Sequence, residues 1–400
     1  MQIIVKLTTD CNLACSYCSE GDQPSCHLSP QLFAKMVDDL PELLNELELK
    51  RLDILFHGGE PMLYGHEELR HLVKLARSRL NDIELTFSMQ TNGTLIDNDW
   101  IDFFRQENIS VGISLDGYPE LHDSKRRTKH GKATAAFIMD NIAKMRAAGL
   151  RVGTLMVLDS AEAVDVDKLL DLIVEHDLQA KIHPVIACGR AEGRKDEQTV
   201  CENYLLLMKS LLPKALKLAT PIKIQPLDEI MNTILGLAPL RECSFNGSCG
   251  KDLICVYADG EVGFCGRDNR TRSLVYGNLA NTTLLELYNS DNAKQIRDRQ
   301  AYLRNHSCQN CRDWDFCHGG CAFEAVNAFG SLTAKYPHCA MRKKLVHYLK
   351  TDGIKLLKEA MVQEKIKFRH SMQLKRKMLG EIDRIALPVN TNNFSEENHA

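Results

Sequence analysis

Short apolar runs rich in β-branched residues alternate with amphipathic stretches over about the first 185 residues. The apolar runs predict strands at residues 3–7, 52–56, 84–90, 110–115, 151–158 and 180–186. Helical periodicity between them predicts helices at about 29–46, 66–80, 97–106, 133–148 and 163–176. This alternation is typical of an α/β fold with a parallel sheet. It fits a partial barrel as well as an open doubly wound sheet, and in both folds functional residues lie at the carboxyl ends of the strands.

The second half of the chain has a different pattern. Residues 189–240 are predicted to be mainly helical, whereas residues 241–339 are rich in Gly, Asn and Cys and contain a predicted hairpin at 254–264. Because we expect this region to bury little apolar surface, bound metal clusters would have to supply much of its folding free energy. A basic amphipathic helix is predicted from residue 342 to about 377, and the polar tail 390–400 is predicted to be disordered.

Length and charge narrow the class of protein. A chain of 400 residues suits a catalytic domain of about 200 residues plus a second module. The net charge of −3 gives no general attraction to nucleic acid or to anionic membranes, so we expect neither as a partner. The amino terminus lacks the features of a signal peptide, and no apolar run approaches the ~20 residues of a membrane span. We therefore expect a cytoplasmic protein.

The chain has 15 cysteines, and they are unevenly distributed. Four lie in the first 26 residues, two lie in the middle, and nine lie between Cys243 and Cys339. The cytosol keeps thiols reduced, so disulfides are a poor explanation for this number. Clustered thiols in a reducing compartment indicate metal ligands.

The first cluster of thiols is a C-x3-C-x2-C loop formed by Cys11, Cys15 and Cys18, directly after the first predicted strand. Three thiolates on a [4Fe–4S] cluster leave one iron open to a ligand that is not protein. That iron could chelate the amino and carboxylate groups of an amino acid. Taken alone, the spacing also permits a zinc site or three unrelated thiols.

The triplet after an amino-terminal strand resembles the radical S-adenosylmethionine (radical SAM) superfamily. The resemblance implies a partial (β/α)6 barrel over residues 1–190. It also implies reductive cleavage of bound SAM to methionine and a 5′-deoxyadenosyl radical, which abstracts a hydrogen atom from the substrate. An external electron donor, such as flavodoxin or ferredoxin, would be required.

The same resemblance implies SAM-binding residues at the strand ends. Tyr17 matches an aromatic residue near the adenine, and the Gly-Gly-Glu-Pro run after the second strand matches a motif that binds the SAM amino group. Polar residues after the fourth strand match contacts to the ribose and the carboxylate. Simple loop packing, turns and surface charges are the alternative explanations, and no residue is assigned a catalytic role. The full set of expected SAM-binding residues is Tyr17, Gly58, Gly59, Glu60, Ser114, Asp116 and Arg126.

The carboxyl-terminal cysteine array supplies eight thiols in two groups of spacings. Eight thiolates suffice for two further [4Fe–4S] clusters without an open iron, although C-x2-C is also a zinc signature. The spacings resemble the SPASM domain of radical SAM enzymes. By that resemblance, auxiliary cluster I would be held by Cys243, Cys249, Cys265 and Cys321. Auxiliary cluster II would be held by Cys308, Cys311, Cys317 and Cys339.

These motifs divide the chain into a radical SAM barrel (1–190), a helical connector (191–240), a SPASM domain (241–340) and a basic helical extension with a tail (341–400). SPASM proteins mostly act on peptides or proteins. We therefore expect an enzyme that abstracts hydrogen from a residue of a ribosomally made precursor peptide. The auxiliary clusters would then accept one electron, so that a crosslink or an oxidised residue forms. Cys26, Cys188, Cys201 and Cys255 are interpreted as ordinary thiols.

Two alternatives stay open. Anaerobic sulfatase-maturating enzymes, which oxidise Cys or Ser to formylglycine, share several segments with this chain. They have an Asp after the third SPASM cysteine and a Gln before Gly-Gly-Glu-Pro, where this chain has Gly266 and His57.

Many peptide maturases have a leader-binding domain before the triplet, which we do not expect with ten residues ahead of Cys11. The more distant alternative is an iron–sulfur electron carrier or a zinc-binding module without catalysis.

Overall fold

A computed structural model of the chain describes residues 1–159, 164–218, 222–268, 272 and 274–362. The predicted disordered tail and the part of the basic helix beyond residue 362 lie outside this range. Within the described range, none of the helices combines the length and the apolar character that crossing a membrane requires.

The six predicted strands are confirmed and lie side by side in chain order. They are β1 (Gln2–Lys6), β2 (Arg51–His57), β3 (Glu84–Thr91), β4 (Ile109–Ser114), β5 (Val152–Leu158) and β6 (Gln179–Pro184). All of these neighbours pair in parallel. The α/β prediction is therefore confirmed, although the edge strands of this curved sheet do not pair with each other to close a barrel in the part of the chain described.

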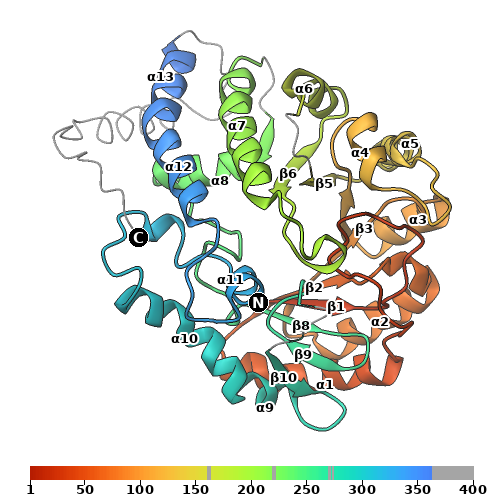
Figure 1. Cartoon of the computed structure of the whole chain (residues 1–400). Coiled ribbons are helices and arrows are strands. Elements are labelled where there is room, and N and C mark those ends of the chain that lie inside the picture. The colour runs from red at the N-terminus through yellow and green to blue at the C-terminus, as the bar shows by residue number, and fades with distance from the viewer. Residues whose placement is uncertain (160–163, 219–221, 269–271, 273, 363–400) are drawn as a thin grey trace.

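Helices cover the outer side of the curved sheet, as Figure 1 shows. They are α1 (Pro30–Glu46), α2 (His66–Arg79), α3 (Asn98–Gln106), α4 (Pro119–Lys125), α5 (Ala135–Ala147) and α6 (Val166–Glu175). Five of them were predicted, and α4 was missed because seven residues are too few for a clear helical period. The Ser29 side chain caps the start of α1 by accepting a hydrogen bond from the Leu32 N–H.

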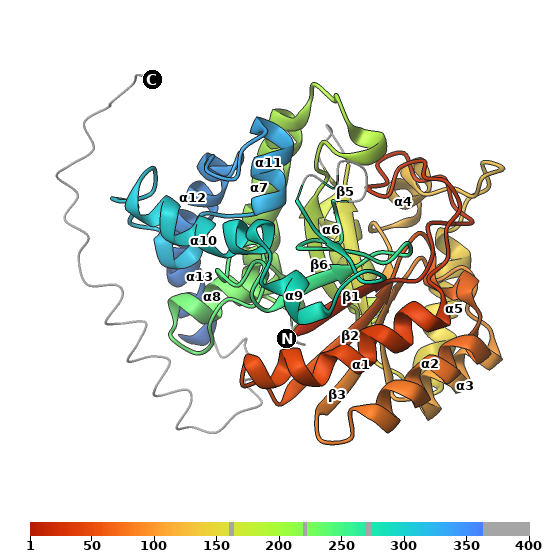
Figure 2. The same ribbon diagram turned by 90° about the horizontal axis from the view of Figure 1, so that it is seen from below.

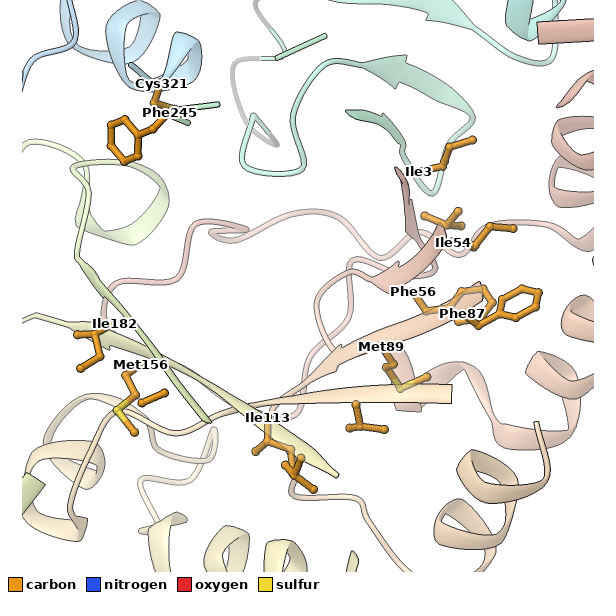
Figure 3. Close-up of a cluster of buried hydrophobic side chains, with 14 of the residues drawn as sticks. Ile3, Ile54, Phe56, Phe87, Met89, Ile113, Met156, Ile182, Phe245 and Cys321 are labelled. Atoms are coloured by element: carbon orange, nitrogen blue, oxygen red, sulfur yellow. The ribbon is translucent and has the colours of Figure 1, made fainter. Parts of the chain in front are cut away.

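The two faces of the strands contact different parts of the protein. On β2, Leu52, Ile54 and Phe56 are buried toward the helices, where Phe56 stacks on Phe87 with ring centroids 5.9 Å apart. Figure 3 shows these side chains with their neighbours from the adjoining strands. The alternate residues Leu55 and His57 line a cavity on the inner side. Period-two alternation thus separates the apolar core from the candidate site.

The second half of the chain extends the same sheet. Strand β7 (Lys223–Gln225) pairs with β6, and β8 (Leu253–Val256) pairs in parallel with β1. The predicted hairpin is confirmed as β8 and β9 (Glu261–Gly263), and β10 (Val275–Asn278) follows. Among the described residues the sheet therefore has ten strands, in the order β10-β9-β8-β1-β2-β3-β4-β5-β6-β7.

Most helices of the second half lie away from α2 and α3 (Figure 2), whereas the short helix at Leu284–Tyr288 packs against α1. The connector contributes α7 (Glu197–Ala215) and α8 (Leu227–Ile234), and the cysteine-rich region contributes α9 (Leu284–Tyr288), α10 (Asp291–Asn305) and α11 (Ala322–Phe329). The basic region forms α12 (Cys339–Tyr348), a π-helical turn (Leu349–Gly353) and α13 (Ile354–Val362). Single 3-10 turns are η1 (Pro61–Tyr64), η2 (Gly189–Ala191) and η3 (Trp314–Phe316).

The cysteine-rich region shares an apolar core with the barrel. Leu284, Ile296 and Phe323 are almost fully buried and belong to the same hydrophobic cluster as the barrel core, and Leu303 is fully buried as well. The prediction that this region buries little apolar surface is therefore wrong. The error arose because the apolar residues of α9 to α11 are spread among many polar ones, and they gain their partners only through tertiary packing.

Phe56→Ala is expected to destabilise the protein by about 3–5 kcal/mol, because the fully buried ring also lies 6.5 Å from Phe33 and its loss leaves a cavity. Chemical denaturation under anaerobic conditions measures the change. Leu63→Ala is the control, since Leu63 is 40% exposed and should change stability by less than about 0.5 kcal/mol. Equal effects of the two substitutions would contradict this account of the core.

Candidate active site

A cavity of about 490 Å³ lies on the inner side of the sheet. Its volume is within the range of about 300–1,000 Å³ that is usual for small-molecule sites. The barrel contributes the triplet Cys11, Cys15 and Cys18 to the lining. The cysteine-rich half contributes Cys243 and Cys265. The two cysteine motifs, distant in sequence, therefore meet around one space.

The triplet loop is held in place from two sides. The Ala14 and Ser16 N–H groups donate to the carbonyls of Arg127 and Lys125, at 2.8 and 3.1 Å. From the far end of the barrel, the Arg190 N–H donates to the Cys18 carbonyl at 3.0 Å and its guanidinium donates to the Cys15 carbonyl at 3.2 Å. The position of the three thiols is thus fixed mainly by backbone hydrogen bonds.

The Gly-Gly-Glu-Pro turn supports this loop through close backbone contact. A Cβ atom at Gly58 would collide with the Thr8 carbonyl, and one at Gly59 would collide with the Asp10 carbonyl. The absence of side chains lets the Gly59 N–H donate to Thr8 at 2.8 Å. Both glycines line the cavity, so their predicted contact with SAM is compatible with their position and stays a prediction.

Glu60 fixes the turn from inside the protein. Its carboxylate is fully buried and accepts hydrogen bonds from the Met62 N–H at 3.0 Å, the Thr91 hydroxyl at 2.7 Å and the Asn92 N–H at 2.8 Å. Burial raises its pKa to about 7, against the opposing effect of these donors. Unlike the two glycines, Glu60 is absent from the described cavity lining, and its contacts join the ends of β2 and β3.

Asp116, Arg126 and Tyr17 form one buried group. The Asp116 carboxylate accepts hydrogen bonds from the Tyr17 hydroxyl, from Arg126 Nε at 2.8 Å and from the Val157 N–H at 2.9 Å. The Arg126 guanidinium lies 5.2 Å from the centre of the Tyr17 ring. Although burial opposes the charge, Asp116 holds the pKa of Arg126 well above its usual value. Tyr17 and Arg126 line the cavity, and Asp116 anchors them from behind.

Ser114 also reaches the cavity, at the carboxyl end of β4. Its hydroxyl accepts a hydrogen bond from Gln90 Nε2 at 3.0 Å, and Gln90 lines the cavity beside it. Five of the seven predicted SAM-binding side chains or glycines adjoin this space directly. They are Tyr17, Gly58, Gly59, Ser114 and Arg126.

The first predicted four-cysteine set lies at the cysteine-rich end of the cavity. Cys321 is buried and Cys249 is partly buried there; desolvation raises the pKa of each thiol, and neighbouring thiols raise it further. For Cys249 those neighbours are Cys243 and Cys265, and for Cys321 the neighbour is Cys265. The fold therefore brings the four thiols into one neighbourhood.

The second set surrounds a separate, smaller cavity of about 20 Å³. Its lining includes all four predicted thiols, Cys308, Cys311, Cys317 and Cys339. In the part of the chain described, no group of three or more His, Cys, Asp or Glu side chains has the geometry to hold a single metal ion. Four thiols around one space fit the ligand set of a [4Fe–4S] cluster, and their ligation stays a prediction.

Comparison with known proteins decides the family. Residues 5–173 match the Radical SAM superfamily, and residues 243–312 match SPASM, an iron-sulfur cluster-binding domain. The chain is a radical SAM enzyme with a SPASM domain. [4Fe–4S] clusters and SAM are accordingly its cofactors. A carrier or zinc module without catalysis is not supported.

The relatives of this radical SAM enzyme include a cysteine-type anaerobic sulfatase-maturating enzyme from Clostridium novyi. The two are 27% identical over 80% of this chain and 87% of the relative. Among solved structures, anSMEcpe with bound AdoMet and a peptide has a TM-score of 0.76 at 24% identity, covering 90% of this chain and 98% of that one. Streptococcus suis SuiB bound to its precursor peptide SuiA has a TM-score of 0.61 at 15% identity, covering 84% and 74%. Both structures support the fold.

A buried group at the cavity wall was missed by the sequence analysis. Lys6 is 3% exposed, forms an ion pair with Glu20, and has its Nζ 3.2 Å from His57 Nδ1. Burial and the Lys6 charge hold the pKa of His57 well below its usual value. The signal was a lone lysine within the apolar run of β1. Cys188, interpreted as an ordinary thiol, also lines the cavity.

Glu60→Gln is expected to destabilise the radical SAM enzyme by about 1–3 kcal/mol, because the amide NH₂ must face a backbone or hydroxyl donor. The folded pKa of about 7 lies above the ordinary 4.5, so folding binds a proton and wild-type stability rises as pH falls from 8 toward 5. The Gln variant lacks this linkage. Denaturation at both pH values should therefore show a larger stability difference at pH 5, and a smaller one would contradict the assignment.

Proposed function

We propose that this radical SAM enzyme modifies a residue of a ribosomally made precursor peptide by hydrogen abstraction followed by one-electron oxidation. The observation that carries the proposal is Gly266, which lines the cavity where sulfatase-maturating enzymes have the Asp that deprotonates their substrate. That position has no acidic side chain here. A crosslink or an oxidised residue is the expected product.

The structure of position 266 argues against a hidden substitute for the base. A Cβ atom there would lie 3.1 Å from Ile4 Cδ1 and 3.4 Å from Lys6 Cε, so β1 side chains occupy the adjoining space. Asp268, two residues further on, is 3% exposed and does not belong to the described lining of the cavity. The local chain therefore offers no carboxylate at this wall.

One further carboxylate at the cavity has a cationic neighbour, because Glu20 pairs with Lys6. A carboxylate beside a cation is a weaker base than a free one, because the cation stabilises its charged form. At Glu20, this arrangement supports a reaction that does not begin with deprotonation of a thiol or hydroxyl.

The assigned roles of the residues follow from their positions. The loop with Cys11, Cys15 and Cys18 would hold the first cluster. SAM bound to the open iron of that cluster would supply the 5′-deoxyadenosyl radical for hydrogen abstraction. Tyr17, Ser114 and Arg126 would position SAM, with the Arg126 guanidinium suited to a carboxylate. The two four-cysteine sets would hold auxiliary clusters I and II, in the domain 241–340.

Formylglycine formation in a sulfatase is the second candidate. It is favoured by the 27% identity to the Clostridium novyi enzyme over most of both chains. The Lys6, Glu20 and His57 group would then have to replace the missing Asp in handling the substrate proton. An external electron donor is required for either reaction.

Iron content tests the cluster assignments. Anaerobic reconstitution should give about twelve irons per chain, because three four-iron clusters are proposed. Cys15→Ala should lower this to about eight and abolish 5′-deoxyadenosine release from SAM under dithionite. Cys26→Ala is the matched control and should change neither value. Zinc in place of iron, or full activity of the Cys15 variant, would overturn the assignment.

Mass spectrometry tests the substrate class. Any short cysteine- or aromatic-containing peptide that is found to be encoded beside this gene is co-expressed with the enzyme, and a loss of two hydrogens indicates a crosslink. A sulfatase-derived peptide incubated with the same enzyme is expected to stay unchanged. If that peptide instead gains an aldehyde, the second candidate is correct. Co-expression with the Cys15→Ala variant shows that any change depends on the radical chemistry.

A further inference from the structure

A buried arginine lies between the main cavity and the small four-cysteine cavity described above. Arg342 is 4% exposed and lines both the main cavity and the small four-cysteine cavity, as Tyr336 also does. It lies on α12, three residues after Cys339, the first residue of that helix. Residues three apart share a helix face, so the guanidinium and the Cys339 thiol are on the same side of α12.

The position of the guanidinium is fixed by contacts that carry no charge. Its Nε and Nη2 donate to the Phe316 carbonyl at 3.1 and 2.9 Å, directly before Cys317. Its Cζ atom lies 3.7 Å from the centre of the Phe245 ring. Glu242, the carboxylate that acts on it most strongly, lines the main cavity and is not part of the described lining of the small one. At the small cavity, Arg342 therefore places a buried positive charge beside the four thiols.

The other charges at this small cavity are closer to solvent. Lys335 and Lys343 are exposed, and Asp313 is partly exposed and pairs with Lys350 at 2.9 Å. Water and salt screen such charges, whereas a buried charge is screened much less. Among the charged groups described at this cavity, Arg342 should thus act most strongly on whatever the thiols hold.

We propose that Arg342 is a positioning residue for auxiliary cluster II and that its charge raises the reduction potential of this cluster. Reduction adds one electron, and hence one negative charge, to the cluster, and a fixed cation nearby stabilises the more negative form. The inference rests on the cluster assignment of the proposed function. Its consequence is that auxiliary cluster II accepts an electron more readily than its thiolate ligands alone would allow.

The test is an anaerobic redox titration of the reconstituted full-length enzyme, followed by electron paramagnetic resonance. The signal of auxiliary cluster II is identified by its loss in the Cys311→Ala variant. Arg342→Met keeps the apolar stem on Phe245 but removes the charge, and it should shift this potential to a more negative value. Arg342→Lys should restore most of the shift, and Lys343→Gln, which removes an exposed charge, should change the potential much less.

An unchanged potential in Arg342→Met with about twelve irons bound overturns the proposal. So does a shift in Arg342→Met that Arg342→Lys fails to reverse. If Arg342→Met does not take up its iron, Arg342→Gln decides, because a glutamine amide can still donate to the Phe316 carbonyl but carries no charge. An unchanged potential in Arg342→Gln would then overturn the proposal. Absence of the third cluster from the wild-type enzyme would instead contradict the proposed function.

Discussion

Strand β1 is the element on which the rest of the structure depends. It pairs in parallel with β2 on one side and with β8 on the other, so five residues join the barrel to the cysteine-rich half. The triplet loop leaves the carboxyl end of this strand. The loop that holds Cys11, Cys15 and Cys18 is thereby placed between the two halves. A slip of β1 by one residue would exchange its buried and cavity-facing side chains, because side chains alternate along a strand.

Buried polar groups then fix the site more tightly than apolar packing alone could. Asp116 holds Tyr17 and Arg126, and Glu60 joins the ends of β2 and β3. Each of these carboxylates is desolvated, which is costly unless its hydrogen bonds are satisfied. Several donors for these hydrogen bonds come from the ends of neighbouring strands. Each of these hydrogen bonds therefore forms only when those strands are correctly arranged. Such groups contribute geometry more than stability.

The barrel could be predicted from sequence because its information is local. Each strand and helix has its own hydrophobic period, and Ser29 marks its own helix start. The pairing of β8 with β1 could not be predicted, since it joins residues about 250 positions apart and leaves no local signal. Glu60 and Asp116 were expected to contact SAM, yet in the structure they stand behind the residues that line the cavity. A sequence motif indicates that a residue belongs to the site. Whether its side chain faces the cavity or supports the lining residues from behind depends on tertiary packing. Lys6 shows the converse, because a single lysine in an apolar strand gives no indication of its partners Glu20 and His57.

The placement of the two four-cysteine sets gives them different chemical environments. Cys243 and Cys265 open into the main cavity, where a substrate radical would form, while the second set has a cavity of its own behind Tyr336 and Arg342. If the two sets hold auxiliary clusters I and II as proposed, an electron leaving the substrate would meet the first set before the second. Onward transfer would be downhill if the second site favoured the reduced state more, and a buried cation at the dividing wall works in that direction. The wall has a structural task as well, because Arg342 joins α12 to the loop that carries Cys317. One side chain thus contributes both to the shape of the second site and to its charge.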